Sequence, residues 1–319
     1  MPVDFSKWIE NSRENILEDP ARGFFKSIYY IYVSIFLTIY CLYPFGTNIF
    51  DKKWDLLIVL DACRVDAIRE VADEYDFIDD VDSIWSVGST SEEWMSMTFQ
   101  TPYRRQIRQT TYVSGNPYTD HVFRQNVCPP AGNALPFGPK DYDVVDTEDF
   151  YMLDEVCEYG IDNSKNAVPA QVMTDRAIDI GRQKGTDRQI VHYMQPHAPY
   201  LGETEIENPV FEKFIAGRLS KEEIWKGYLD NLRYVLDHVK ILIENTDAEK
   251  VVITADHGEM FGEWSFYDHT VACPHPSVRK VPWIETEAND LGTYEPSVDP
   301  GNVATTFDRQ EHLENLGYL

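Results

Sequence analysis

Short apolar runs alternate with longer amphipathic segments from Trp54 onward, and this alternation is the strongest constraint on the fold. The run at residues 55–61, DLLIVLD, has only apolar residues between its two acids, which is typical of a strand that a sheet buries on both faces. Residues 220–245 place apolar side chains at three- and four-residue steps, which predicts a long amphipathic helix. Further strands are predicted at 83–87, 110–114, 188–194, 250–255 and 281–284, and further helices at 64–75, 90–99 and 169–184. This order predicts an α/β fold, a three-layer sandwich with helices on both faces of a mostly parallel central sheet.

The chain divides into two expected parts. Residues 1–50 form a helical segment that is a candidate for membrane association, and residues 51–319 form one α/β domain. Within that domain, residues 119–165 are rich in proline, glycine and acids with poor periodicity, which predicts an excursion of loops.

The apolar stretch at residues 27–45 carries no charge, and its length is close to the roughly 20 residues that span a bilayer. Five tyrosines and a Pro-Phe-Gly breaker argue against a span, since a helix that is apolar all round can also be buried against the main domain. We therefore expect a buried or interfacial helix, with a membrane anchor as the alternative. Under the positive-inside rule an anchor would have its N-terminus in the cytoplasm, because four basic residues precede it. These are Lys7, Arg13, Arg22 and Lys26.

The charge balance excludes one class of partner. Fifty-four acids face 28 bases, for a formal net charge of -26, so a nucleic-acid backbone would be repelled. The acids are spread along the chain, which indicates an acidic surface suited to a high-salt cytosol, as in the acidic proteome of a halophilic organism. An ordinary acidic mesophilic protein is the alternative interpretation.

Five cysteines, an odd number without a C-x-x-C pair, make a disulfide framework or a zinc-thiolate site unexpected. They are Cys41, Cys63, Cys128, Cys157 and Cys273. The first 23 residues are polar and charged, so we expect no cleavable signal peptide and a reducing, cytoplasmic location.

Polar residues follow several of the predicted strands. Asp61 ends the first strand, Ser89 and Thr90 follow the second, and His197 and the pair 256–257 follow later ones. Ligands of open parallel sheets bind beyond the carboxyl ends of the strands. We therefore expect these side chains, far apart in the sequence, to converge on one edge.

The segment Asp256-His257-Gly258 indicates a metal site, because an acid and an imidazole at a strand end can turn toward one cation. A capping Asp beside a surface His would look the same. With Asp61, the pair forms a mixed carboxylate and imidazole set, which suits Zn or Mn better than Ca or Mg. The sequence leaves open whether the site holds one metal ion or two. A second ion would need a further carboxylate ligand, for which Asp230 and Asp268 are candidates.

Three neighbouring hydroxyls, Ser89, Thr90 and Ser91, lie at the predicted start of a helix. Thr90 and Glu93 have the spacing of a capping box, and this structural role alone would explain them. A hydroxyl at a helix N-terminus also lies where an anion is favoured, and a nearby divalent metal would make it a nucleophile. Four of the eight histidines fall in predicted strands or the loops after them, namely His192, His197, His257 and His269.

The order of these motifs resembles the sulfatase-like branch of the alkaline phosphatase superfamily, over about residues 54–285. It is especially similar to the threonine-nucleophile members, the lipoteichoic acid synthases and lipid A phosphoethanolamine transferases. The motifs are Asp61, Gly88-Ser89-Thr90-Ser91, His197-Ala198-Pro199-Tyr200, Asp256-His257-Gly258-Glu259 and His269. The resemblance implies an alkaline phosphatase-like fold.

The resemblance also implies roles for individual residues. Thr90 would be the nucleophile and a metal ligand, and Asp61, Asp256 and His257 would complete the metal site. His197 and His269 would act in catalysis by meeting the substrate or a second metal, and Arg279 resembles part of the family's closing strand. Four further residues near these motifs are candidates for substrate binding, namely Ser89, Ser91, His192 and Arg64.

Two departures from the family pattern bear on the reaction. No C/S-x-P-x-R motif of formylglycine sulfatases occurs, and Ala62 replaces the second member of a paired Asp. We therefore expect a metal-dependent hydrolase or transferase that acts on phosphate or sulfate esters through a covalent threonine intermediate. Its substrate would be a small-molecule, glycan or lipid-linked ester. A formylglycine-free sulfatase and a non-catalytic binding module on the same fold are the alternatives.

The acidic composition predicts salt-dependent stability. The melting temperature should rise steeply as KCl increases from low to molar concentration, because screening relieves repulsion among the acids. Differential scanning fluorimetry across that range checks this, and a flat melting temperature would contradict a high-salt adaptation.

Overall fold

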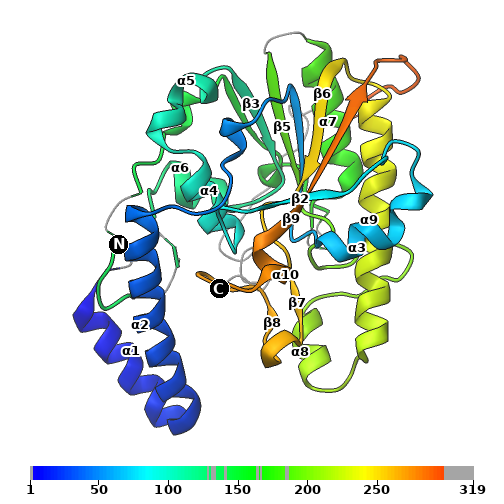
Figure 1. Cartoon of the computed structure of the whole chain (residues 1–319). Helices are drawn as coiled ribbons and strands as arrows, with labels where there is room; N and C mark the ends of the chain where they lie inside the picture. The colour runs from blue at the N-terminus through cyan, green and yellow to red at the C-terminus, as the bar shows by residue number, and fades with distance from the viewer. Residues whose placement is uncertain are drawn as a thin grey trace.

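The computed structural model describes residues 3–297 except 128, 131–133, 140–141, 163–164, 166 and 184–186, so residues 298–319 of the expected α/β domain lie outside it. A seven-stranded sheet lies at its centre, with the order β2-β9-β6-β1-β5-β3-β4 (Figure 1). The sheet strands are β1 (Leu56–Leu60), β2 (Asp82–Trp85), β3 (Thr110–Ser114), β4 (Met152–Glu155), β5 (Arg188–Tyr193), β6 (Ala248–Thr254) and β9 (Lys280–Ala288). A separate antiparallel pair joins β7 (Met260–Phe261) and β8 (Tyr267–Asp268). The α-helices are α1 (Phe5–Glu18), α2 (Pro20–Leu42), α3 (Val65–Val71), α4 (Ser91–Thr98), α5 (Arg104–Ile107), α6 (Tyr118–Phe123), α7 (Ala170–Arg182), α8 (Val210–Ile215), α9 (Lys221–Ile243) and α10 (Pro276–Arg279).

Strand β1 lies at the middle of the sheet and separates two hydrophobic cores. Its side chains alternate, so Leu56, Ile58 and Leu60 pack with α3, α7 and α9 on one face. Leu57 and Val59 pack with α4, α5 and α6 on the other face. Figure 1 shows these two helical layers on either side of the sheet. Because all five side chains are buried, the strand has the continuous apolar sequence that predicted it.

The predicted three-layer α/β sandwich is confirmed, including the mostly parallel sheet. Strands β1, β3, β4, β5 and β6 pair in parallel, whereas β9 is antiparallel to both β6 and β2. The predicted loop excursion at 119–165 is wrong where it contains most of α6 and the parallel edge strand β4. The side chains of that strand are only partly buried, so its sequence, MLDE, lacks the apolar run that marks the inner strands.

The N-terminal segment forms a helical hairpin, α1 and α2. Asp19 caps α2 by accepting hydrogen bonds from two amides of its first turn, and Pro20 starts the helix without needing a donor. The helix therefore starts seven residues before the apolar stretch. Val33 and Leu37 are buried against the domain, whereas Ile35 and Ile39 are exposed. The expectation of a buried helix is therefore met on one face of α2, and the other face is exposed. By length and composition, α2 is also the one helix among the described residues that could cross a membrane.

A buried ion pair joins Glu93 in α4 to Arg279, the last residue of α10 and the one directly before β9. Arg279 Nη2 lies 2.6 Å from Glu93 Oε1, and neither side chain has exposed surface. The other guanidinium nitrogens donate to backbone carbonyls, Nε to Cys273 at 2.8 Å and Nη1 to Val87 at 3.1 Å. The pair therefore connects three segments that are distant in the sequence.

Glu93 also organises the loop that leads into α4. Its Oε2 accepts hydrogen bonds from the amide and the hydroxyl of Ser89, at 3.2 and 2.7 Å, and from the amide of Ala272 at 3.1 Å. The predicted capping box is thus half formed. Thr90 accepts the amide hydrogen of Glu93, but the Glu93 carboxylate binds Ser89 and Arg279 instead of the amide of Thr90.

Three aromatic rings near the N-terminal hairpin surround the Arg279 guanidinium. The rings of Phe36, Tyr40 and Phe45 have their centroids 5.3, 5.7 and 5.2 Å from its carbon. The hydroxyl of Tyr40 donates to the carbonyl of Val87, which also accepts from Arg279. The hairpin and the residues just after it therefore cover the buried guanidinium with aromatic rings, which interact favourably with its charge.

The buried ion pair predicts a large cost for removing one partner. Glu93→Gln should lower the free energy of unfolding by about 3–5 kcal/mol, because Arg279 would keep its buried charge without a counterion. Glu74→Gln is the control, since Glu74 pairs with Arg233 at the surface and such pairs contribute about 1 kcal/mol or less. Urea unfolding measures both, and equal losses would contradict the role assigned to the buried pair.

Candidate active site

Asp61, Asp256 and His257 lie beyond the carboxyl ends of the neighbouring central strands β1 and β6. Their candidate ligand atoms all lie within 4.8 Å of one another. His257 Nε2 is 3.6 Å from Asp61 Oδ1 and 3.4 Å from Asp256 Oδ2, and all three side chains are fully buried. The structure therefore brings together the three residues that the sequence proposed as metal ligands.

The hydrogen bonds of His257 give it the tautomer that a metal ligand requires. Its Nδ1 lies 2.9 Å from the carbonyl oxygen of Gly258, which can only accept, so Nδ1 carries the proton. The lone pair of Nε2 then faces the two carboxylates. A side chain at Gly258 would place a Cβ 2.1 Å from the carbonyl oxygen of Ser277, so glycine allows this close approach.

The electrostatics of the two carboxylates also fit a divalent cation. Burial, together with the neighbouring Asp256 carboxylate, raises the pKa of Asp61 well above its usual range. Asp256 Oδ1 accepts from the amides of Ala62 at 3.2 Å and His257 at 2.8 Å. A divalent cation between the two carboxylates would offset their repulsion.

Ser91 contributes the hydroxyl that contacts this group. Its Oγ lies 2.7 Å from Asp256 Oδ2, 3.2 Å from Asp61 Oδ2 and 3.4 Å from His257 Nε2. It occupies the first turn of α4, where free amides and the helix dipole favour an anion. A hydroxyl, a metal-ligand set and a helix N-terminus therefore meet at one point.

The two preceding hydroxyls have other contacts. Thr90 Oγ1 accepts the amide hydrogen of Glu93 at 3.1 Å, as an N-cap does. Ser89 Oγ donates to the Glu93 carboxylate at 2.7 Å and to the carbonyl of Thr270 at 2.8 Å. Neither has a described hydrogen bond to the metal-ligand candidates, whereas Ser91 contacts all three.

Two residues from neighbouring strands support the carboxylates. His192, within β5, places Nε2 3.6 Å from Asp256 Oδ2, and its Nδ1 lies 2.8 Å from the hydroxyl of Tyr112. Asn116, after β3, donates from Nδ2 to Asp61 Oδ2 at 2.9 Å. No role was predicted for Asn116 from the sequence. It follows the predicted strand at 110–114, and side chains beyond the carboxyl ends of such strands are expected to bind ligands, so the sequence contained a signal for it.

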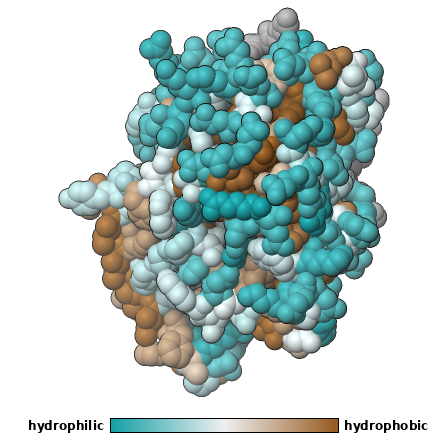
Figure 2. Space-filling view, turned by 45° about the vertical axis from the view of Figure 1, so that its right-hand side comes forward, coloured by the Kyte–Doolittle hydropathy of each residue, from teal (hydrophilic) through white to brown (hydrophobic). Residues whose placement is uncertain are grey.

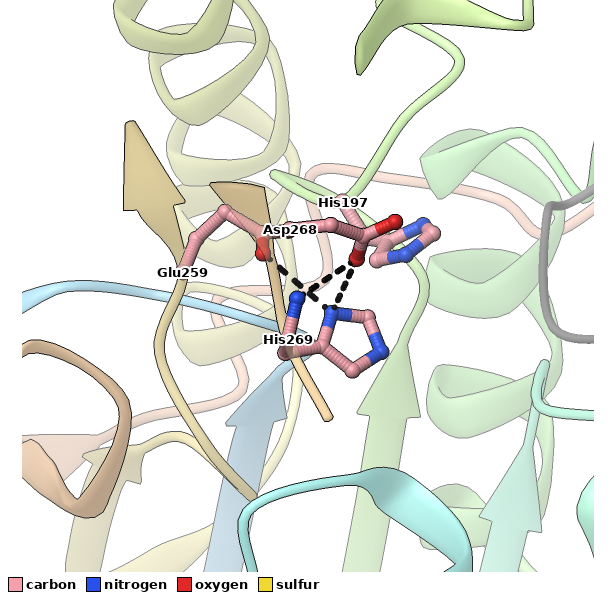
Figure 3. A group of neighbouring side chains, drawn as sticks. All are labelled: His197, Glu259, Asp268 and His269. Carbon is pink, nitrogen blue, oxygen red and sulfur yellow. Dashed lines mark hydrogen bonds and ion pairs between the residues drawn. The ribbon is translucent and has the colours of Figure 1, made fainter. Parts of the chain in front are cut away.

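A second group of possible ligands consists of His197, Glu259, Asp268 and His269 (Figure 3). His269 Nδ1 lies 2.9 Å from Asp268 Oδ1 and 3.3 Å from Glu259 Oε1. Its ring centroid is 4.2 Å from that of His257, so the two groups adjoin. Asp268 was one of the two residues predicted from the sequence as a carboxylate ligand of a second metal ion. Glu259 belongs to the motif Asp256-His257-Gly258-Glu259, but no role was predicted for it.

The histidines of this second group differ in charge. Burial lowers the pKa of His197 to about 4, so its ring is neutral near pH 7. Burial would also lower the pKa of His269, but the carboxylates of Glu259 and Asp268 outweigh it and raise that pKa well above its usual range. Burial raises the pKa of Glu259 to about 7. The group can therefore hold a proton on His269 beside a neutral imidazole.

Two other predicted residues are engaged elsewhere. The Arg64 guanidinium binds Asp66 at 2.6 Å and Glu263 at 2.6 Å, and it donates to the carbonyl of Glu259. Asp230, the other candidate for a further carboxylate, forms an ion pair with Lys226 at 2.9 Å. The structure does not bring either side chain into the two ligand groups.

Comparison with solved structures confirms the alkaline phosphatase-like fold that the resemblance implies. The soluble domain of lipooligosaccharide phosphoethanolamine transferase A from Neisseria meningitidis aligns with a TM-score of 0.50 and 14% identity, over 77% of this chain and 79% of that one. The integral membrane form of that transferase gives 0.48 and 14%, over 77% and 49%. The periplasmic domain of phosphoethanolamine transferase EptC from Campylobacter jejuni gives 0.44 and 14%, over 72% and 77%. No protein-family model and no curated protein matches the sequence.

The candidate ligand set predicts stabilisation by a divalent metal. Zn²⁺ or Mn²⁺ at about 100 times its Kd should add about 2.7 kcal/mol to the free energy of unfolding. Asp256→Asn should abolish this gain and the bound metal, because it removes a ligand and a buried charge. Asp230→Asn is the control, since Asp230 lies in an ion pair outside the group. Thermal shift and elemental analysis measure both variants, and equal metal content in the two would contradict the assignment.

Proposed function

We propose that this protein is a metal-dependent hydrolase or transferase of phosphate or sulfate esters, which forms a covalent ester on a hydroxyl at the start of α4. The observation that supports it is the position of Ser91 Oγ, in contact with Asp61, Asp256 and His257 at a helix N-terminus. The absence of the formylglycine motif favours phosphate esters. The structural neighbours named phosphoethanolamine transferases agree with that choice.

The contacts favour Ser91 over Thr90 as the attacking residue. Thr90 matches the family motif, but its oxygen accepts a backbone hydrogen bond within the cap. Ser91 follows it by one residue, and its oxygen faces the candidate metal ligands. We therefore assign Thr90 to positioning the helix start and Ser91 to attack.

The reaction would proceed in two displacements. A bound divalent ion would lower the pKa of the attacking hydroxyl and stabilise charge on the transferring group. After its proton passes to water, Ser91 Oγ forms a bond to phosphorus, and the bond from phosphorus to the leaving oxygen breaks. Water or an acceptor alcohol then attacks the serine ester and frees Ser91.

His269 is the residue suited to protonate the leaving oxygen. Its ring is held by Asp268 and Glu259, which stabilise its protonated form. His197 Nδ1 lies 2.6 Å from the carbonyl oxygen of Ala198, so the proton lies on Nδ1 and the lone pair on Nε2, the form in which an imidazole meets a substrate or a second metal ion. The substrate would be a small-molecule, glycan or lipid-linked ester.

The test of this function is turnover of a panel of aryl phosphate monoesters, diesters and aryl sulfates, with Zn, Mn, Mg and Ca each supplied. Turnover of phosphate esters that depends on Zn or Mn is the expected result. Turnover of sulfates alone would point to the formylglycine-free sulfatase. Metal binding without turnover of any ester would point to a binding module.

The choice of nucleophile predicts opposite behaviour for two neighbouring variants. Ser91→Ala should reduce turnover on the order of a thousandfold or more and prevent formation of the covalent ester. Thr90→Ala should lose about 1 kcal/mol of stability with its cap and still form the ester. Acid quenching followed by peptide mass spectrometry locates the adduct, and an adduct on Thr90 would overturn our assignment.

A further inference from the structure

The outer face of α2 is a continuous apolar stripe. Five of its residues lie three or four positions apart on one side of the helix, with exposed fractions between 37% and 69%. They are Ile28, Tyr32, Ile35, Ile39 and Leu42. Phe24 and Phe25, both more than half exposed, extend the stripe toward α1. Figure 2 shows this apolar band along the hairpin, in contrast to the hydrophilic surface of much of the α/β domain on the same side.

The opposite face of α2 is fixed to the domain. Val33 and Leu37 are fully buried there. The hydroxyl of Tyr29 donates to the carbonyl of Val271 at 2.5 Å. At the edge of the outer stripe, the hydroxyl of Tyr32 also reaches the domain and donates to the carbonyl of Ala272 at 2.8 Å. A helix that crossed a bilayer would have to give up these contacts, so α2 is held along the surface of the domain.

Helix α1 is also incompatible with a transmembrane position of the hairpin. It packs closely on α2, since a Cβ at Gly23 would lie 2.4 Å from the backbone of Asn15. Its exposed residues include Glu10, Arg13 and Glu14, which the hydrocarbon of a membrane would exclude. The hairpin as a whole therefore suits the boundary between water and lipid.

The charge distribution favours a lipid surface over a second copy of the chain. Residues 1–50 contain four bases and five acids, so nearly all of the net charge of -26 lies in the rest of the protein. The outer stripe of α2 itself includes no charged residue, which suits the apolar boundary of a lipid surface. Two copies joined through this face would instead bring two strongly acidic domains together.

We propose that the outer face of α2 binds the surface of a lipid bilayer, with the helix lying parallel to the membrane plane. In Figure 1 the hairpin projects beyond the sheet on the side of β7 and β8, which contain part of the second ligand group. The segment that α2 holds, residues 270–272, directly follows His269. Resting on the proposed function, this placement points to an ester whose headgroup is presented at a membrane.

Flotation of the full chain with vesicles tests the lipid-binding step without any assay of activity. The protein should float with phosphatidylcholine vesicles, whose zwitterionic surface does not repel the acidic domain. The double variant Ile35→Glu/Ile39→Glu should reduce the bound fraction roughly tenfold or more, because two charges would enter the apolar boundary. Ile215→Glu is the matched control, since Ile215 on α8 is 61% exposed and lies outside the hairpin, and it should bind as the wild type does.

Three results would overturn the proposal. One is flotation that the double variant leaves unchanged. Another is a wild-type protein that does not float and is a dimer in sedimentation, with a monomeric double variant, which would assign the face to a second copy. The third is a bound protein that sodium carbonate does not extract, which would indicate a transmembrane helix. Turnover of a soluble aryl ester should be equal in wild type and double variant, so failure of lipid binding is distinguishable from failure of the proposed reaction.

Discussion

The ion pair between Glu93 and Arg279 is the interaction on which the edge of the sheet with the candidate active site depends. A charge without exposed surface is stable only when its partners remain in place, and here each partner also binds backbone groups of other segments. Glu93 holds the amide and hydroxyl of Ser89, so the pair fixes the turn that leads into α4. The position of Ser91 relative to Asp61 and Asp256 follows from that turn.

The candidate site consists of two adjoining groups of side chains with different electrostatic properties. Asp61 and Asp256 are buried close to each other, an arrangement that is costly for the protein alone and favourable around a divalent cation. The adjoining group around His269 has two carboxylates of its own, which raise the pKa of that imidazole well above its usual range. One group is thus suited to hold positive metal charge and the other to hold a proton.

The sequence was most informative where buried strands end in polar residues. Asp61, Asp256 and His257 could be predicted because apolar runs precede them and because carboxyl ends of parallel strands share one edge. Strand β4 could not, since it lies at the sheet edge and its side chains are only partly buried. The choice between Thr90 and Ser91 depends on the rotation of one helix turn, which adjacent hydroxyls in a sequence do not reveal.

The aromatic rings that surround Arg279 make the N-terminal hairpin more than a detachable anchor. Phe36, Tyr40 and Phe45 all precede the first strand of the sheet, yet their rings shield the Arg279 charge from water. The partner of that charge, Glu93, fixes the turn that leads into α4. Removal of the hairpin would hydrate this charge and loosen the turn that carries Ser91. The N-terminal hairpin and the α/β domain therefore share one buried core, and the two parts are expected to unfold as one unit.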